Sequence, residues 1–362
     1  MAVSLAKWGN DLHTGKKSYP IVTKRRRWFV VSLLLMALAI ALLARYGIIQ
    51  GIDFKGGSKF DVGNVSTDNT QLAKDAIATV DPAAEPSVVV QTDLDGAMTI
   101  EVKMASVDDA TAVAIQDALG AAYDVDAQDA VSVTIVGPTW GGDVSSKALK
   151  ALVIFLVLVT AVMAVYFRAW RMAVAALIAL FHDLLFTAGI YAGVGFEVSP
   201  ATVIGFLTIL GFSLYDTVVV FDKVRENTAE YLSQKRYTYA ELANLAVNQT
   251  LVRSINTSIV ALLPVVSILF IGTQLFHADT LKDISLALFV GMAVGTYSSI
   301  FVATPFEVAL RGREPAVRKH TEEVLALRAA QGIDPSTPTA VVTVSPGEHR
   351  GIQAQPRSKR RS

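Results

Sequence analysis

The chain has 362 residues, no cysteine, and 32 basic and 32 acidic side chains. Only 18% of its residues are charged and 52% are hydrophobic, and the mean hydropathy is +0.45. Since roughly a quarter of the residues of a soluble domain are charged, this composition indicates an integral membrane protein. The lack of cysteine excludes disulfides and thiolate metal sites. The sequence also lacks a Walker loop, a dinucleotide fingerprint and a zinc-protease motif, so we expect no enzyme activity, cofactor or metal.

Six stretches are apolar enough to cross a bilayer, which takes about 20 residues. The first two contain only 17 uncharged residues each, but snorkelling side chains at their ends can extend them. Pro264 lies inside the fifth stretch and is expected to kink it or to lie beside an unpaired carbonyl. The six stretches are residues 28–44, 151–167, 172–196, 198–221, 254–276 and 284–306.

Charge is sorted by segment. Residues 1–27 contain seven basic side chains and one acidic side chain, residues 45–143 contain five and sixteen, and the chain from residue 311 contains ten and five. Because basic segments stay on the inner side of a membrane, we expect a multi-pass protein of the cytoplasmic (inner) membrane with both termini cytoplasmic. The first apolar run exceeds that of a signal peptide, and no small-x-small cleavage site follows it, so an uncleaved anchor is expected.

The chain is therefore expected to be an α-helical polytopic membrane protein with six transmembrane helices and one extracytoplasmic domain between helices 1 and 2. A short helix at 239–251 and another at 317–330 are expected outside the spans, and the chain from residue 337 has a composition typical of disorder. The expected layout is a basic cytoplasmic segment (1–27), transmembrane helix 1 (28–44), the extracytoplasmic domain (45–146), transmembrane helices 2–6 (147–310) with a cytoplasmic loop (222–252), and a largely disordered basic tail (311–362).

The segment between the first two spans shows the pattern of an α+β domain. Strand-like and helix-like stretches follow one another in the order β-α-β-β-α-β, with a turn at 93–96 between the middle strands. This order is typical of a ferredoxin-like split βαβ unit. The stretches are 58–62, 69–80, 87–91, 98–103, 110–123 and 131–136.

Asp216 lies inside the fourth apolar stretch, where a charged side chain costs roughly 2.5–3.5 kcal/mol and usually faces the bundle interior. Ser213 precedes it by three residues and shares its helix face. Gly205 and Gly211 are expected to allow close helix approach. Asp216 is thus a candidate for proton exchange within the bundle, and a static hydrogen bond between helices is the alternative.

Arg253 opens the fifth stretch, and Asn256 and Thr257 extend a polar stripe from it. The guanidinium can pair with an ionised Asp216 and release a protonated one, which would make a two-state element. An ordinary positive anchor at the helix end is the alternative. Asp183 lies eleven residues into the third stretch, at a depth of about 16 Å, so proton transfer and a structural partnership remain equally open for it. The adjacent His182 is expected to point away from Asp183, by about 100° around the helix.

Five motifs resemble the SecF subunits of the SecD/SecF family, which are similar to half of a resistance-nodulation-division (RND) transporter. The motifs follow the family order and cover most of residues 28–310, and the fourth-span motif is the most specific. They are GIDFKGG (51–57), VGPTWGG (136–142), FHD (181–183), GFSLYDTVVVFDKVREN (211–227) and QTLVRSINTS (249–258).

This resemblance implies an accessory subunit of the Sec protein translocase that uses the proton gradient to promote export. It implies SecD, the SecYEG channel, the substrate polypeptide and membrane lipid as partners in a heteromeric complex, with no nucleic acid. The proton-coupling Asp of the family corresponds to Asp216, its essential Arg corresponds to Arg253, and Asp183 matches a further family Asp. The alternatives are an RND-type small-molecule or lipid exporter and a scaffold that only stabilises its partner.

Overall fold

The computed structural model describes residues 5–92, 96–274 and 279–332. The chain divides into two compact units, of which the first contains 1–31, 215–256 and 299–362, and the second contains 32–214 and 257–298. Within the described ranges, six helices are long and apolar enough to cross a membrane. The six spans that hydropathy predicts are therefore present as helices.

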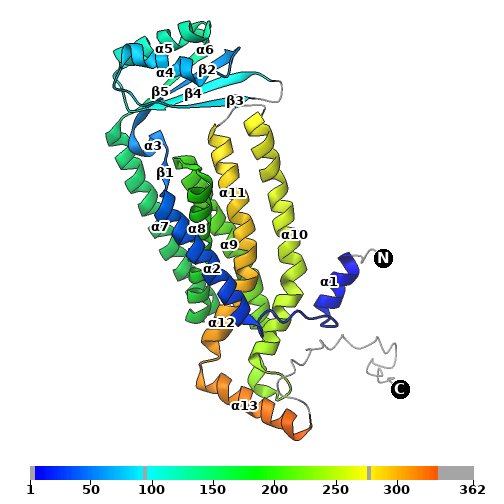
Figure 1. Cartoon of the computed structure of the whole chain (residues 1–362). Helices are drawn as coiled ribbons and strands as arrows, with labels where there is room; N and C mark the ends of the chain where they lie inside the picture. The colour runs from blue at the N-terminus through cyan, green and yellow to red at the C-terminus, as the bar shows by residue number, and fades with distance from the viewer. Residues whose placement is uncertain (1–4, 93–95, 275–278, 333–362) are drawn as a thin grey trace, which may run out of the picture. The chain divides into compact units, whose positions relative to one another are not determined.

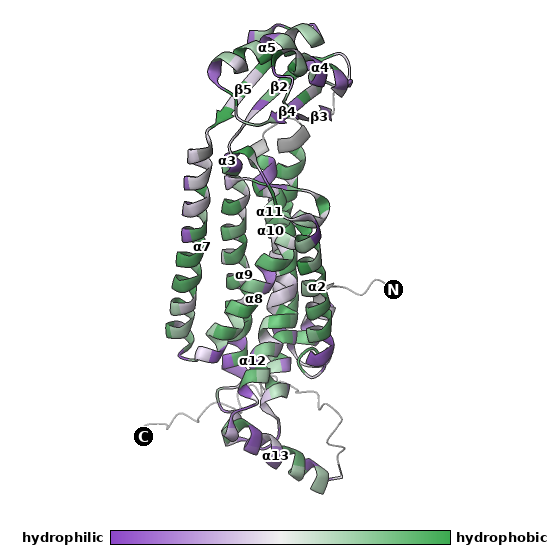
Figure 2. Cartoon of the chain, turned by 60° about the vertical axis from the view of Figure 1, so that its left-hand side comes forward, coloured by the Kyte–Doolittle hydropathy of each residue, from purple (hydrophilic) through white to green (hydrophobic). Residues whose placement is uncertain are grey.

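Most of the membrane-type helices extend beyond the predicted stretches, because their polar flanks continue the helical backbone. The last one continues from α11 through a π-helical turn (Ser299–Ala303) into α12 (Thr304–Arg311). Figure 2 shows hydrophobic residues over the later part of α7, after a more polar beginning, and exposed apolar side chains of this helix include Leu149 and Val165. The helices are α2 (Arg25–Tyr46), α7 (Pro138–Phe167), α8 (Trp170–Val194), α9 (Pro200–Asn227), α10 (Tyr239–Gln274) and α11 (Asp279–Ser298).

The second unit contains a four-stranded antiparallel sheet in the order β3-β4-β2-β5. Helices α4 and α5 cover one face of it (Figure 1), and the fully buried side chains of Phe60, Ile77 and Ile115 form part of the core between them. The predicted order of elements is present, and residues 93–95 of the expected turn lie outside the described residues. The elements are β2 (Gly57–Val65), α4 (Thr70–Val80), β3 (Ser87–Thr92), β4 (Met98–Met104), α5 (Asp109–Tyr123), the short α6 (Ala127–Ala130) and β5 (Val131–Val136).

Polar side chains define where the helices of this α+β part begin. Asn69 accepts a hydrogen bond from the backbone N–H of Gln71 and caps α4. Asp108 caps α5 by accepting from the backbone N–H of Thr111 at 2.7 Å, and this bond lowers the pKa of Asp108. Such caps satisfy backbone donors that have no partner within the helix.

The sheet face away from the helices holds a chain of ion pairs. Lys103 Nζ lies 2.9 Å from Glu101 and 2.8 Å from Glu197 of the short strand β6 (Glu197–Val198), which pairs with β1 (Ile49–Gln50). Burial opposes the charge of Lys103, but the hydrogen bonds to Glu197 and Glu101 outweigh it and raise the pKa of Lys103.

Two of the sequence motifs meet at the base of the α+β part. The GIDFKGG motif forms α3 (Ile52–Lys55), and VGPTWGG forms the beginning of α7. A Cβ atom on Gly141 would lie 2.6 Å from the carbonyl oxygen of Phe54, so only glycine permits this approach. The two motifs are therefore explained by packing against each other.

Small residues set the helix contacts in the second unit. A Cβ atom on Gly189 of α8 would overlap Ala39 of α2, and one on Gly205 of α9 would lie 2.7 Å from the Cβ of Ala287 in α11. The expected close approach at Gly205 is therefore confirmed. The expectation for Gly211 is wrong, because no described atom lies within 4 Å of the position a Cβ would take there.

The segment that follows α1 (Leu5–His13) is held against α10 in the first unit. Tyr19 N–H donates to Asn248 Oδ1 at 2.7 Å, and Asn248 Nδ2 donates back to Tyr19 O at 3.0 Å. Val22 N–H donates to Asn244 Oδ1 at 3.0 Å. Leu12 and Val22 are fully buried, so apolar packing accompanies these bonds.

A second connection in the first unit joins α13 (Pro315–Ala330) to the beginning of α10. Arg328 makes two hydrogen bonds of 2.8 Å to the carboxylate of Glu241, and both side chains are buried. His320 Nε2 lies 2.7 Å from Gln234 O, next to the 3-10 turn Tyr231–Ser233. The helix expected at 317–330 is therefore present, and residues 333–362 of the expected tail lie outside the described residues.

The structure changes two expected boundaries. The short helix expected at 239–251 and the fifth span are a single helix, α10, of 36 residues. No glycine or proline interrupts the sequence between residue 239 and Pro264, so the backbone has no reason to break at Arg253. Likewise α9 continues to Asn227, inside the expected loop 222–252, and residues 275–276 of the predicted fifth span lie outside the described residues.

Candidate functional site

Asp216 is buried on α9 in the first unit. Its Oδ1 accepts a hydrogen bond of 2.7 Å from Ser254 Oγ on α10, and Ser254 is fully buried. Its Oδ2 is also buried and has no hydrogen-bond partner among the described residues. The hydroxyl of Ser299 also interacts with the Asp216 side chain, and Ser299 Oγ accepts a hydrogen bond of 3.1 Å from Thr217 Oγ1.

Arg253 does not contact Asp216. Among the described residues no ion pair within 4.0 Å joins them, and Arg253 is exposed. Successive helix residues are about 100° apart, so with Ser254 facing Asp216 its neighbour is turned away. Of the rest of the predicted stripe, Asn256 is exposed and Thr257 is half-buried. The structure thus brings Asp216 together with Ser254 rather than with the stripe.

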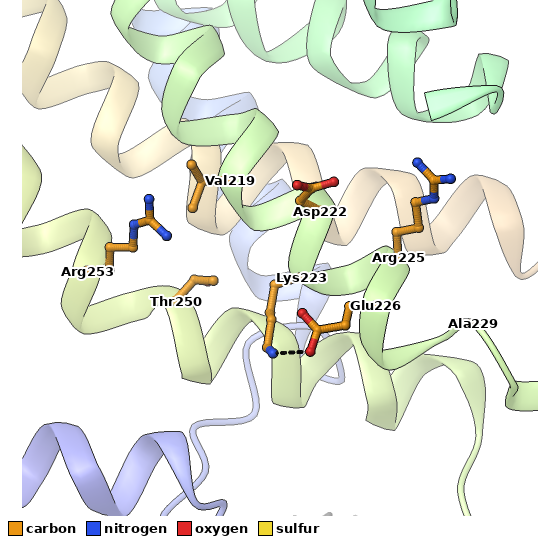
Figure 3. Close-up of a pocket in the computed structure, with 8 residues that line it drawn as sticks. All are labelled: Val219, Asp222, Lys223, Arg225, Glu226, Ala229, Thr250 and Arg253. Carbon is orange, nitrogen blue, oxygen red and sulfur yellow. Dashed lines mark hydrogen bonds and ion pairs between the residues drawn. The ribbon is translucent and has the colours of Figure 1, made fainter. Parts of the chain in front are cut away.

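Arg253 instead lines an open pocket of about 510 Å³ together with residues of α9 (Figure 3). Figure 3 shows Asp222 and Arg225 on the α9 side and the 2.7 Å ion pair between Lys223 and Glu226. Charged side chains of both helices, including Asp222 and Arg253, thus line this open pocket.

Asp183 is fully buried on α8 in the second unit. Its Oδ2 accepts hydrogen bonds from Ser213 Oγ at 2.5 Å and from Ser298 Oγ at 2.8 Å. Its Oδ1 lies 3.2 Å from His182 Nδ1, which is buried as well. The expectation that His182 points away is wrong, because the ring folds back beside the carboxylate and packs 6.1 Å from the ring of Tyr297.

Ser213 thus donates to Asp183, although it lies on the same helix as Asp216. Ser254 and Ser298 were missed by the sequence reasoning. Ser254 could have been considered because it directly follows Arg253. Successive helix residues point in different directions, so a residue next to an outward-facing one can face inward. Ser298 lies in the sixth predicted span, residues 284–306, which contains no acidic residue. Nothing in the sequence connected it with Asp183.

The surroundings of the two buried carboxylates differ. Asp183 has both oxygens occupied, which fixes its position. Asp216 has Oδ1 bonded to Ser254, whereas no donor meets the hydrogen-bond geometry at its Oδ2 among the described residues. A hydroxyl can donate to a carboxylate and accept from a carboxylic acid, and the contact between Asp216 and Ser254 can persist in both states.

The comparisons with known proteins agree with the helical architecture. Residues 115–313 match the family model "Protein export membrane protein SecD/SecF, C-terminal". The chain belongs to the SecD/SecF family. The match covers α7 to α12 and includes Asp183, Asp216 and Arg253.

Relatives within the SecD/SecF family cover nearly the whole chain. The protein translocase subunit SecF of Streptomyces coelicolor is 47% identical over 89% of this chain and 84% of its own length. The SecF subunit of Mycobacterium tuberculosis H37Rv is 44% identical over 88% of this chain and 72% of its own length. The structure of SecDF, a translocon-associated membrane protein from Thermus thermophilus, matches with a TM-score of 0.71 and 30% identity over 83% of this chain. This chain spans 39% of that SecDF chain.

Proposed function

We propose that the chain is an accessory subunit of the Sec protein translocase that uses the proton gradient to promote export of polypeptides across the cytoplasmic membrane. Its relatives are protein translocase subunits SecF, which supports this role over a small-molecule or lipid exporter. Because the chain spans 39% of a SecDF chain, we propose that SecD supplies the remaining part and that the pair acts with SecYEG.

The burial of Asp216 carries the proton-coupling part of the proposal. Its carboxylate is held in an apolar helix by the neutral hydroxyl of Ser254 and has no ion-pair partner among the described residues. An intramembrane acid of this kind is a candidate proton carrier. In the proposed cycle, protonation of Asp216 removes the negative charge that attracts Arg253, α9 and α10 shift, and the movement reaches the domain at 45–146.

We place the termini in the cytoplasm and the domain at 45–146 outside it. The basic segments at 1–27 and beyond residue 311 and the acidic segment at 45–143 support this orientation. Asp183 is assigned a positioning role, because its two oxygens already have three neighbouring groups within 3.2 Å.

The test compares Asp216→Asn with Asp143→Asn, which removes an exposed carboxylate at the beginning of α7. Each variant replaces the native chain in cells, and the rate of secretion is measured with the proton gradient present and collapsed. We expect Asp216→Asn to lose the gradient-dependent part of the rate and Asp143→Asn to retain it. A normal gradient-dependent rate for Asp216→Asn would contradict the mechanism.

The same experiment separates a scaffold from a proton-coupled subunit. A scaffold predicts that Asp216→Asn leaves export intact, whereas deletion of the chain lowers the amount of SecD. A small-molecule exporter predicts a changed drug susceptibility of the deletion strain with normal secretion. The amount of SecD is therefore measured by immunoblot in every strain, and the deletion strain is also tested with a panel of drugs.

A further inference from the structure

A groove lies between α5 and the outer side of β5 in the second unit. Asp109, Ala112, Val113 and Gln116 of α5 line it on one side, and Val133 and Ile135 of β5 line it on the other, around a volume of about 320 Å³. Val113 is 56% exposed and Ile135 is 37% exposed. These apolar side chains are thus open to solvent, and they lie outside the buried core that the sheet forms with α4 and α5.

The strand that borders this groove is an edge of the sheet. β5 pairs with β2 on one side from Val131 to Val136 and has no strand on the other side within the described residues. In an antiparallel pair, alternate residues direct their N–H and C=O groups away from the partner strand. β5 therefore presents backbone donors and acceptors next to the apolar groove.

Gln116 fixes this edge in place. Its Nε2 donates to Val131 O at 2.8 Å and to Ala127 O at 2.9 Å, so the side chain ties α5 to the beginning of β5. The helix and the strand that border the groove are thereby joined by a side chain. A groove whose walls are already joined costs less conformational entropy when a ligand binds.

An exposed strand edge beside an apolar groove binds extended peptides, because the peptide backbone pairs with the edge while alternate side chains enter the groove. Val133 and Ile135 point to the groove side, whereas the alternate residues Ser132 and Thr134 are exposed and polar. An added strand would therefore place its apolar side chains on one face only, following the period of two.

The acidic side chains in and around the groove favour a peptide with basic residues. Asp109 lines the groove, and residues 45–143 contain sixteen acidic and five basic side chains. We propose that α5 and β5 form a binding site for an extended polypeptide segment with alternating apolar residues and basic flanks, which adds to the sheet as a strand beside β5. The proposal rests on the proposed function, in which an exported polypeptide is the unfolded chain that reaches this domain.

The binding test uses the full chain together with SecD in lipid nanodiscs. The probe is a fluorescent synthetic peptide that alternates Ile and Thr between Lys flanks, and a second probe has the same sequence with alternate backbone nitrogens methylated. We expect saturable binding of the first probe and a loss of about tenfold in affinity, or about 1.4 kcal/mol, for the methylated one. Equal affinities would overturn the proposal, because backbone pairing would then contribute nothing.

Matched variants locate the site. Val113→Arg places a cation in the groove, whereas Val89→Arg makes the same change on β3, the opposite edge of the sheet, where Val89 is 49% exposed. We expect Val113→Arg to weaken binding about tenfold and Val89→Arg to leave it unchanged. Both positions are exposed, so unfolding is not expected, and circular dichroism checks this. Equal affinities for wild type and Val113→Arg would overturn the proposal.

Crosslinking in cells separates this site from the proposed function. A photo-crosslinking amino acid at position 113 is expected to capture a stalled export substrate, and the same amino acid at position 89 is not. If position 113 captures only SecD, or nothing, while Asp216→Asn still removes gradient-dependent export, the groove proposal is overturned and the proposed function remains. If position 113 captures the substrate while Asp216→Asn exports normally, the proton-coupled function fails and the site remains.

Discussion

Ser254 Oγ lies 2.7 Å from Asp216 Oδ1 and links α10 to α9, whereas Arg253, the residue before Ser254, is exposed. The buried carboxylate is therefore stabilised by a neutral donor rather than by a cation. A variant at Ser254 therefore tests the contact of Asp216 without changing any charge.

Ser254→Ala is expected to slow gradient-dependent export without abolishing it. The substitution removes the donor that orients Asp216 but leaves the carboxylate, and a buried acceptor that loses its partner costs about 1–3 kcal/mol. The measurement is the secretion rate with and without the gradient. Ser267→Ala serves as the control, because Ser267 is exposed on the same helix and donates only to Leu263 O of its own helix. Wild-type rates for Ser254→Ala would show that the hydrogen bond has no role.

Gly189→Ala is expected to destabilise the packing of α2 on α8. The new methyl group would overlap Ala39, and overpacking of this kind costs about 1–3 kcal/mol. Gly211→Ala makes the same change where no described atom lies within 4 Å, so its stability should equal that of wild type. Thermal unfolding in detergent compares the two. Equal melting temperatures for both variants would contradict the close contact at Gly189.

Arg328→Ala is expected to release α13 from α10. It leaves the buried carboxylate of Glu241 without its cation, which costs about 3–5 kcal/mol. Arg318→Ala is the control on the same helix, because Arg318 is 75% exposed in its ion pair with Glu322 and such pairs contribute at most about 1 kcal/mol. The readout is the rate of proteolysis within residues 313–332. The double variant Arg328→Met with Glu241→Leu should restore resistance, and equal sensitivity of both arginine variants would refute the prediction.

The ion pairs of Lys103 predict a loss of stability at alkaline pH. Its pKa in the folded protein is raised above the ordinary value of 10.5, against the effect of burial, by hydrogen bonds to Glu197 and Glu101. The stabilisation is therefore complete below the ordinary pKa and disappears as the pH rises through the higher folded value. Thermal unfolding of wild type and Lys103→Met from about pH 8 to about pH 12 should show a difference that shrinks at the upper end. A constant difference would exclude this linkage.

Hydropathy alone was sufficient to predict the membrane helices, and period-two and helical patterns were sufficient for the sheet and its two covering helices. These features depend on the residues within each element, so a single sequence is enough to predict them. The burial of Asp216 and Asp183 also followed from the cost of exposing a charge to lipid. By contrast, the continuity of α10 through Arg253 was missed, because a change from polar to apolar residues was read as a boundary although it does not interrupt a helix.

The partners of the buried acids were not predictable. Ser254 is 38 residues from Asp216, and Ser298 is 115 residues from Asp183, so each contact depends on how two helices are rotated relative to each other. A rotation of one residue would have placed Arg253 where Ser254 lies. The same limit applies to Ser213, whose bond to Asp183 could not be predicted, since a shared helix face does not say which neighbouring helix it meets.

The paired hydrogen bonds between Tyr19 and Asn248 join residues 229 positions apart. A ribosome finishes the segment that contains Tyr19 long before it reaches α10, so the backbone groups of Tyr19 and Val22 must stay hydrated until α10 has been made. Closure of this contact therefore cannot precede the synthesis of Asn248, with 114 of the 362 residues still to be added. A chain truncated before residue 244 would leave its leading segment undocked and open to quality-control proteases.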